Sequence, residues 1–357
     1  MNSQRESTSV AVVADVVEQT QRTVELLEAG DLEGAVAIWS PPNPQMLVAY
    51  FAANWAPTLD EACGDGRRIT EVWQLPTTNP VVRLRIEGDA GGAVATFSFS
   101  CGGRPAGYQV TDTLREGIFN IVIGTTVEGY RPTADFYAAL LGWRIVREDW
   151  LKIAPTRAST LQLAFGDGWS DTRPPRWGDP DHPQQVHLDV FVPDLTAAAA
   201  GALAAGATAL AEGDGHRVLA DTVGHPFCLR EDASLDAPTI GTVVFDCDDP
   251  APMAAFWGSL LSMKERVEHG PDRVVIRGED PISPMVGFQR VDDYRRPTWP
   301  GDEYPEQLHV DLAFDDRPAA QRRGEDLGAT LLPPPHGSAP VYADPAGHPF
   351  CLGGQGE

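Results

Sequence analysis

The chain contains one stretch twice, and this repeat restricts the fold more than any other feature. GHPFCL occurs at residues 224–229 and again at 347–352. Upstream, RPPRWGDPDHPQQVHLDV matches RRPTWPGDEYPEQLHVDL without a gap, and ADFYAALLGW matches AAFWGSLLSM. Three matches in one order indicate an internal duplication. We therefore predict two copies of one unit, at residues 117–230 and 238–353.

The sequence of each copy predicts one strand, one helix and three strands, followed by the same order a second time. In the first copy IFNIVIGTTV predicts a strand, and TADFYAALLG predicts a helix with an apolar aromatic stripe. Three short strands, a Pro-rich loop, the strand VHLDVFV and the helix LTAAAAGALAAG follow. Two strands close the copy, and GHPFCL lies in the last. The polar segment 230–238 is the predicted linker between the copies.

Residues 1–115 precede the repeat and predict a separate α+β domain. The segment from VVADVVEQ to AIWSPP predicts two helices joined by a turn at Gly30 and Asp31, and PQMLVAYFAANWAPTLDEAC predicts a third. RITEVWQL, VVRLRIEGD, AVATFSFSC and GRPAGYQVTD predict four strands. Helices followed by a run of strands are typical of an α+β unit. Its aromatic residues have two interpretations, as pocket lining or as core: Tyr50, Trp55, Trp73 and Tyr108.

The charge of the chain excludes several classes of partner. With 27 Lys and Arg against 51 Asp and Glu, the net charge of −24 argues against nucleic acid and against anionic membrane surfaces. No apolar run is long enough to span a bilayer, and the first residues lack the pattern of a signal peptide. We therefore expect an acidic cytoplasmic protein, and its composition, rich in Ala, Gly and Pro, is typical of a bacterium. The 5 cysteines form no CxxC motif and are expected to be reduced.

The repeated motifs resemble the vicinal-oxygen-chelate superfamily, in its glyoxalase and bleomycin-resistance-like branch. FYAALLGW, HLDV, GATAL and VLADTVGHPFCL carry this resemblance in order. It implies a cupped sheet built from paired βαβββ units, with the ligand cavity inside the cup. In the N-terminal part, GDLEGAVAIWS, ITEVWQL and GGRPAGYQV resemble NTF2-like, cystatin-like cone proteins. We therefore expect an α+β fold with an NTF2-like domain at 1–115 and glyoxalase-like modules at 117–230 and 238–353.

The resemblance implies metal ligands on three strands, and this chain keeps one of them. The His that opens the fifth strand corresponds to His187 and His309, whereas the Glu of the last strand falls on Cys228 and Cys351. The first-strand position falls on residues that are not usual ligands: Thr242 in the second copy and Asn120 or Val122 in the first. A catalytic metal needs about three protein ligands. We therefore expect no cofactor, and a divalent metal held by these His and Cys residues is the alternative.

Two His-x-Asp pairs are the candidate catalytic residues. In a strand, His187 and Asp189 point to the same face, and so do His309 and Asp311. Each pair has two interpretations. It is either an orienting hydrogen bond beside a buried Cys, or a general base with the group that orients it.

The loops and strands near these pairs supply candidate ligand-binding residues: Arg173, Trp177, Phe191 and Cys228 in the first copy, and Arg295, Trp299, Tyr304 and Cys351 in the second. A Trp plate beside an Arg suits a carboxylate or phenolate. The alternative is that each Trp pins a long loop against the sheet.

Taken together, these features favour a metal-free protein that binds a flat, partly apolar metabolite or antibiotic in the cup. The first alternative is a metal-independent lyase, isomerase or cyclase of bacterial secondary metabolism that uses a His-Asp pair as general base. The second is a metal-dependent enzyme of the same superfamily with a His/Asp/Cys site, and the third is a structural assembly. We expect a small-molecule partner and a homodimer.

Overall fold

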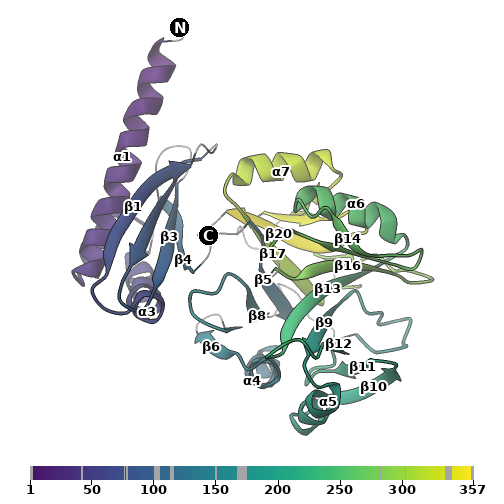
Figure 1. The fold of residues 1–357 in the computed structure, drawn as a ribbon. Coiled ribbons are helices and arrows are strands. Elements are labelled where there is room, and N and C mark those ends of the chain that lie inside the picture. The colour runs from purple at the N-terminus through teal and green to yellow at the C-terminus, as the bar shows by residue number, and fades with distance from the viewer. Residues whose placement is uncertain are drawn as a thin grey trace.

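The computed structural model describes the chain except residues 1–2, 42, 76, 78, 100–104, 113–115, 149–150, 167–174, 281–282, 302, 334–339 and 355–357. Figure 1 shows an N-terminal domain beside a larger body that the repeat forms. No helix in the described parts of the chain is long and apolar enough to cross a membrane.

The N-terminal domain consists of helices followed by an antiparallel sheet. The helices are α1 (Ser3–Glu28), α2 (Leu32–Trp39) and α3 (Pro44–Cys63). The strands, in sheet order, are β1 (Arg68–Leu75), β2 (Val81–Glu87), β3 (Gly92–Phe99) and β4 (Pro105–Thr111). Asp31 and Asn43 accept hydrogen bonds from backbone N–H groups of the first turns of α2 and α3, which fixes where these helices begin. The predicted helices and strands are therefore confirmed, and the resemblance to NTF2-like proteins stays a prediction.

Each copy contains two βαβββ units, as predicted. The first copy contains β5 (Gly117–Gly124), a 3₁₀ turn (Val127–Gly129), α4 (Tyr130–Leu141), β6 (Arg144–Arg147), β7 (Lys152–Ala154), β8 (Gln162–Gly166), β9 (Val186–Val192), α5 (Leu195–Ala204), β10 (Thr208–Gly213), β11 (His216–Ala220) and β12 (Pro226–Glu231). The second contains β13 (Thr239–Cys247), α6 (Pro250–Leu260), β14 (Glu265–His269), β15 (Arg273–Arg277), β16 (Met285–Arg290), β17 (Leu308–Phe314), α7 (Arg317–Asp326), β18 (Thr330–Leu331), β19 (Val341–Ala343) and β20 (Pro349–Gly354).

The two large sheets each take one unit from each copy. The sheet that contains His187, called the His187 sheet, has the order β10-β11-β12-β9-β13-β16-β15-β14. The sheet that contains His309, called the His309 sheet, has the order β18-β19-β20-β17-β5-β8-β7-β6. The copies join where β9 pairs antiparallel with β13, and where β17 pairs antiparallel with β5. The boundaries of the sheets therefore differ from those of the sequence repeat.

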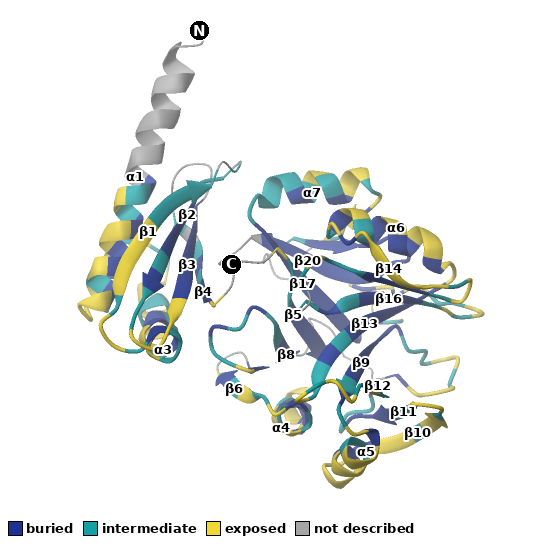
Figure 2. Cartoon of the chain, viewed as in Figure 1, coloured by how far each residue is buried: buried dark blue, intermediate teal, exposed yellow. Residues whose placement is uncertain are grey.

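The central strands place their residues alternately on two faces. Val186, Leu188 and Val190 of β9 belong to one buried apolar core that also takes Leu308 and Val310 of β17 and residues of all four repeat helices. Figure 2 shows that the central strands of both sheets are mostly buried. Because side chains alternate along a strand, the residues between them lie on the opposite face, which we call the cup face.

The GHPFCL stretch mainly builds a turn that connects the two sheets. Gly224 has a φ of 100°, in the left-handed region that favours glycine. The Asp221 carboxylate accepts hydrogen bonds from the backbone N–H groups of Val223 and His225 and from the Tyr137 hydroxyl of α4. His225 Nε2 lies 2.6 Å from the Gly124 carbonyl oxygen at the end of β5.

The second copy repeats this turn with small changes. Gly347 also has a φ of 100°, Asp344 accepts a hydrogen bond from the His348 backbone N–H, and Trp257 of α6 takes the place of Tyr137 as donor to the Asp. The duplicated motif is thus largely architectural, and its Cys is the residue that reaches the cup face.

Candidate functional site

Strand register aligns the candidate residues in rows across the cup face of each sheet. In the His309 sheet, one row runs through Cys351, Asp311, Asn120 and Gln162, and the next through His309, Val122, Ala164 and Lys152. In the His187 sheet, the matching rows are Cys228, Asp189, Thr242 and Met285, and His187, Val244, Gly287 and Val275. Cross-strand partners share a face and lie in contact. The structure therefore brings the predicted His, Asp and Cys of each copy together, and the paired strands add residues of the other copy to each row.

In the His309 sheet, the imidazole lies between two carboxylates. Its Nδ1 is hydrogen-bonded to Glu306 in the segment before β17, and its Nε2 lies 3.3 Å from Asp311 Oδ1. Burial alone would lower the pKa of His309, but Glu306 and Asp311 raise it well above its usual value. Burial would raise the pKa of Asp311, but His309, Asn120 and Lys152 lower it. At neutral pH the pair is therefore an imidazolium and a carboxylate.

Asn120 leaves an unused acceptor next to this pair. Its Nδ2 donates a hydrogen bond of 2.9 Å to Asp311 Oδ2. Its Oδ1 is buried and accepts no hydrogen bond from any residue that the structure describes. Leaving a buried polar group unsatisfied costs about 1–3 kcal/mol. The cup face therefore offers a position for a donor group of a ligand.

The same residues fit a metal ion by ligand type. His309, Asp311 and Cys351 each offer one ligand atom, and these atoms lie within 4.8 Å of one another. A mixed nitrogen, oxygen and sulfur set suits zinc, and Glu306 on Nδ1 occupies the place of an outer-shell orienting carboxylate. However, burial and the Asp311 charge raise the pKa of Cys351 to about 12. Ligation would therefore require both Cys351 and His309 to lose protons.

In the His187 sheet, a neutral amide takes the place of the carboxylate. Gln184 Nε2 lies 3.0 Å from His187 Nδ1 and 2.9 Å from Asp246 Oδ2. His187 Nε2 lies 3.5 Å from Asp189 Oδ1. Burial raises the pKa of Asp246 to about 6, against the opposing charge of His187 and the hydrogen bond from Gln184.

Two arginines occupy the other oxygen of Asp189. Arg273 Nη2 and Arg230 Nε lie 2.6 Å and 2.9 Å from Asp189 Oδ2. Burial would raise the pKa of Asp189, but His187 and both arginines lower it to about 2. Burial and the Asp189 charge raise the pKa of Cys228 to about 12. A cation bound here would meet two guanidinium groups, so the His187 sheet is the less favourable metal site.

The two matching Trp residues lie in different environments. Trp299 is 4% exposed and packs with Cys351 and Val341 beside the His309 sheet. Trp177 is 48% exposed, and Arg173, the first residue of its loop segment, lies outside the described residues.

The remaining predicted ligand-binding residues contact their own neighbours. Arg295 is hydrogen-bonded to the Tyr304 hydroxyl and lies 5.2 Å from the Tyr304 ring centre. Phe191 lies over Gly241, where a Cβ atom would overlap its ring.

Sequence reasoning missed the residues that set the charge of each site. Gln184 and Glu306 occupy matching places before β9 and β17. Arg230 and Arg273 bind Asp189, and the charge of Lys152 lowers the pKa of Asp311. The first pair could have been found, because the gapless alignment of the copies sets Gln184 against Glu306. The cations could not, since each acts on an Asp brought to it by strand pairing.

Comparison with known proteins identifies the repeat. The family described as glyoxalase-like domain matches residues 121–230 and 242–353. No curated protein matches the chain.

Among solved structures, a putative dioxygenase from Bacillus subtilis is 17% identical and covers 67% of this chain and 85% of its own, with a TM-score of 0.47. A glyoxalase I variant from Zea mays is 15% identical and covers 65% and 91%, with a TM-score of 0.48. An antibiotic-binding protein from a Streptomyces species is 16% identical and covers 32% and 93%, with a TM-score of 0.24.

Proposed function

Because the chain belongs to the glyoxalase-like domain family and carries that domain twice in tandem, we propose that it is a cytoplasmic protein that binds a small organic molecule on the cup face of the His309 sheet. The observation that carries this proposal is the buried, unsatisfied Oδ1 of Asn120, in the same row as Asp311 and Cys351. A ligand hydroxyl, phenol or amine that donates to this oxygen would satisfy it.

The surroundings of Asn120 favour a flat, partly apolar ligand. Cys351 presents a protonated thiol, which behaves as a small apolar group, and Trp299 packs against it. Val122 adds an aliphatic wall in the neighbouring row. Small-molecule sites typically combine apolar walls with a few converging polar groups.

The charge state of His309 favours binding over general-base catalysis. An imidazolium held between Glu306 and Asp311 has no lone pair with which to accept a proton. A lyase, isomerase or cyclase that used His309 as a base would first have to remove this proton. The cation instead keeps Asp311 ionised and its Oδ2 bound to Asn120, which fixes the direction of the Asn120 oxygen.

A metal site is the second candidate, supported by the convergence of His309, Asp311 and Cys351. An ion held there would supply Lewis-acid chemistry to a ligand oxygen. The two candidates differ in what a variant of Asn120 does. Organic binding depends on Asn120, whereas the three ligand atoms remain in an Asn120→Leu protein.

Native mass spectrometry and metal analysis of the protein purified from its host test the proposal. We expect an organic adduct on the wild type that is lost from Asn120→Leu and His309→Gln and kept by His269→Gln, which replaces an exposed His of β14. About one transition metal per chain, lost from His309→Gln and kept by Asn120→Leu, would contradict the proposal and support the metal site. An adduct retained by Asn120→Leu would also contradict it.

A further inference from the structure

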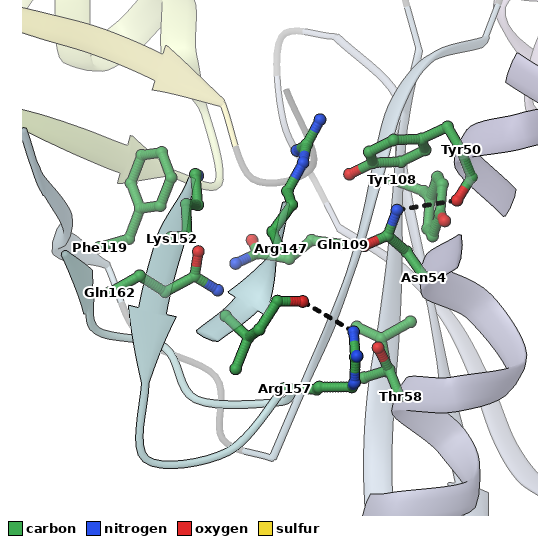
Figure 3. A pocket seen from close by; sticks show the side chains of 12 residues that line it. Tyr50, Asn54, Thr58, Tyr108, Gln109, Phe119, Arg147, Lys152, Arg157 and Gln162 are labelled. Carbon is green, nitrogen blue, oxygen red and sulfur yellow. Dashed lines mark hydrogen bonds between the residues drawn. The ribbon is translucent and has the colours of Figure 1, made fainter. Parts of the chain in front are cut away.

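A cavity of about 110 Å³ lies between the N-terminal domain and the His309 sheet. Figure 3 shows Tyr50 of α3 and Tyr108 of β4 on one side, and Lys152 of β7 and Gln162 of β8 on the other. Arg147, at the end of β6, lies between them (Figure 3).

Ion pairs hold the N-terminal domain in this position. Arg83 of β2 is hydrogen-bonded to Asp315, just after β17, and the Arg83 side chain is largely buried. Glu61 of α3 is hydrogen-bonded to Arg144 of β6 and accepts a hydrogen bond of 3.2 Å from the Arg157 backbone N–H. The cavity therefore lies between two parts of the chain that these ion pairs join.

The cavity continues the rows of the proposed site. Gln162 follows Asn120 in the row that starts at Cys351, and Lys152 lies in the row of His309. Neighbouring strands are about 4.8 Å apart, so a ligand of modest size would reach from Asn120 into the cavity. The N-terminal domain thus covers the end of the cup face where β8 and β7 lie.

The cavity gathers positive charge in a chain whose net charge is −24. Arg147, Lys152 and Arg157 line it, and its described lining includes no carboxylate. The Arg147 guanidinium lies 4.8 Å from the Tyr50 ring centre, and Arg157 Nη1 donates a hydrogen bond of 2.7 Å to the Val146 carbonyl oxygen. These contacts fix two of the cations at the wall. Lys152 is only 5% exposed, and its charge acts on Asp311 in the neighbouring row.

Tyr108 provides an independent sign of a ligand. It is 7% exposed, and its hydroxyl is buried without a hydrogen-bond partner among the described residues. Burial raises the pKa of Tyr108 well above its usual value, so the hydroxyl keeps its proton and can donate. Tyr108 lines the cavity, where a ligand oxygen would accept a hydrogen bond from its hydroxyl.

We propose that the N-terminal domain completes the ligand site of the His309 sheet, and that the cavity binds the carboxylate of a small aromatic acid between Arg147, Lys152, Arg157 and the Tyr108 hydroxyl. The aromatic walls, Tyr50, Tyr108 and Phe119, suit a flat ring next to that carboxylate. A cavity of about 150 Å³ holds benzene, so the volume here suits a carboxylate and part of a ring. This inference rests on the proposed function, because the remainder of the ligand would extend towards Asn120.

Calorimetric titration of the full-length protein with benzoate tests this inference, with neutral benzamide as the matched probe. We expect benzoate to bind and benzamide not to bind. Lys152→Met should weaken benzoate binding at least about tenfold, and Tyr108→Phe a few-fold, in line with loss of charged and neutral hydrogen bonds. Arg85→Met removes the same charge from a half-buried position of β2 outside the cavity lining, and should leave the affinity unchanged. Tyr108→Phe removes one oxygen and keeps the ring, so it tests the site even if Lys152→Met does not fold.

Equal affinity for benzoate and benzamide would overturn the inference, as would an Arg85→Met effect as large as that of Lys152→Met. Absence of benzoate binding, together with an organic adduct that depends on Asn120, would contradict the anion site and leave the proposed function standing. Benzoate binding that depends on Lys152 and Tyr108, with an adduct that Asn120→Leu retains, would support the anion site and contradict the proposed function.

Discussion

Both sheets place a His, an Asp and a Cys together on the cup face, yet the groups around the two His–Asp pairs carry different charges. In the His187 sheet, a neutral Gln184 contacts the His, and two arginines bind the Asp. In the His309 sheet, Glu306 contacts the His, and an amide, Asn120, binds the Asp. The repeated residues therefore do not define the chemistry of either site. Their neighbours do, and the neighbours differ between the copies.

The largest expected effect comes from removing each Asp in turn. Asp189 is 1% exposed and pairs with Arg230 and Arg273, so Asp189→Ala removes the buried carboxylate that both guanidinium groups share and leaves Arg273 only its ion pair with Glu268. Breaking a buried ion pair costs about 3–5 kcal/mol. Asp311→Ala should cost less, because Glu306 still neutralises His309. Urea unfolding followed by circular dichroism measures both losses, and equal losses would mean that the arginines do not distinguish the sites.

Much of the secondary structure that positions the two sites was predicted from the sequence. The duplication follows from the repeated motifs, and the order of strands and helices in each copy and in residues 1–115 follows from apolar periodicity and turn residues. Those patterns are local, and they survive in each copy separately.

The pairing of the sheets was not predictable in the same way. The strands of the two copies have nearly the same sequence pattern. The residues alone therefore do not distinguish strand pairing within a copy from strand pairing between copies. The partners of Asp189 illustrate the consequence, since Arg230 belongs to the first copy and Arg273 to the second. Trp177 and Trp299 illustrate it again. They align in sequence, but burial depends on what each loop meets in space.

Asp246 makes the stability of the His187 sheet depend on pH. The matching position in the His309 sheet is Gly124, so only the His187 sheet carries this carboxyl. Because its pKa is raised to about 6 in the folded protein, its contribution favours folding at low pH and is lost as the pH rises through about 6. Asp246→Asn keeps an acceptor for Gln184 and removes the buried charge, and should therefore stabilise the protein by about 1–3 kcal/mol at pH 7.

Unfolding measured at pH 4 and at pH 7 checks the sign. The advantage of Asp246→Asn should be present at pH 7 and absent near pH 4, where the wild-type carboxyl is protonated. Gly124→Asn, at the matching position, should show no such pH dependence. A constant difference at both pH values would contradict the raised pKa of Asp246.

An aromatic ring occupies different strands in the two sheets. Phe191 lies over Gly241 in the His187 sheet, whereas the matching positions in the His309 sheet are Ala313 and Phe119. Gly241→Ala places a methyl group against the Phe191 ring, and overpacking of this kind costs about 1–3 kcal/mol. Thermal unfolding should show this loss in the single variant and a smaller loss in the Phe191→Ala background. If the loss were unchanged in that background, the ring contact would not be its cause.

Replacing Glu306 by Gln is expected to change the stability least, and it tests most directly how the two sheets differ. Glu306→Gln gives His309 the amide neighbour that His187 has, and should lower the pKa of His309, because Glu306 is the strongest of the groups that raise it. The raised pKa stabilises the folded protein below pH 6.5 or so, and this contribution is lost as the pH rises through the folded value. Glu306→Gln should therefore cost about 1 kcal/mol at pH 7 and less at high pH. Histidine resonances followed by NMR measure the pKa of His309 directly, in the wild type and in Glu306→Gln. If Glu306→Gln left the pKa of His309 unchanged, the charge difference between the two sheets would have to arise from the cations Arg230, Arg273 and Lys152 rather than from the residue at Nδ1.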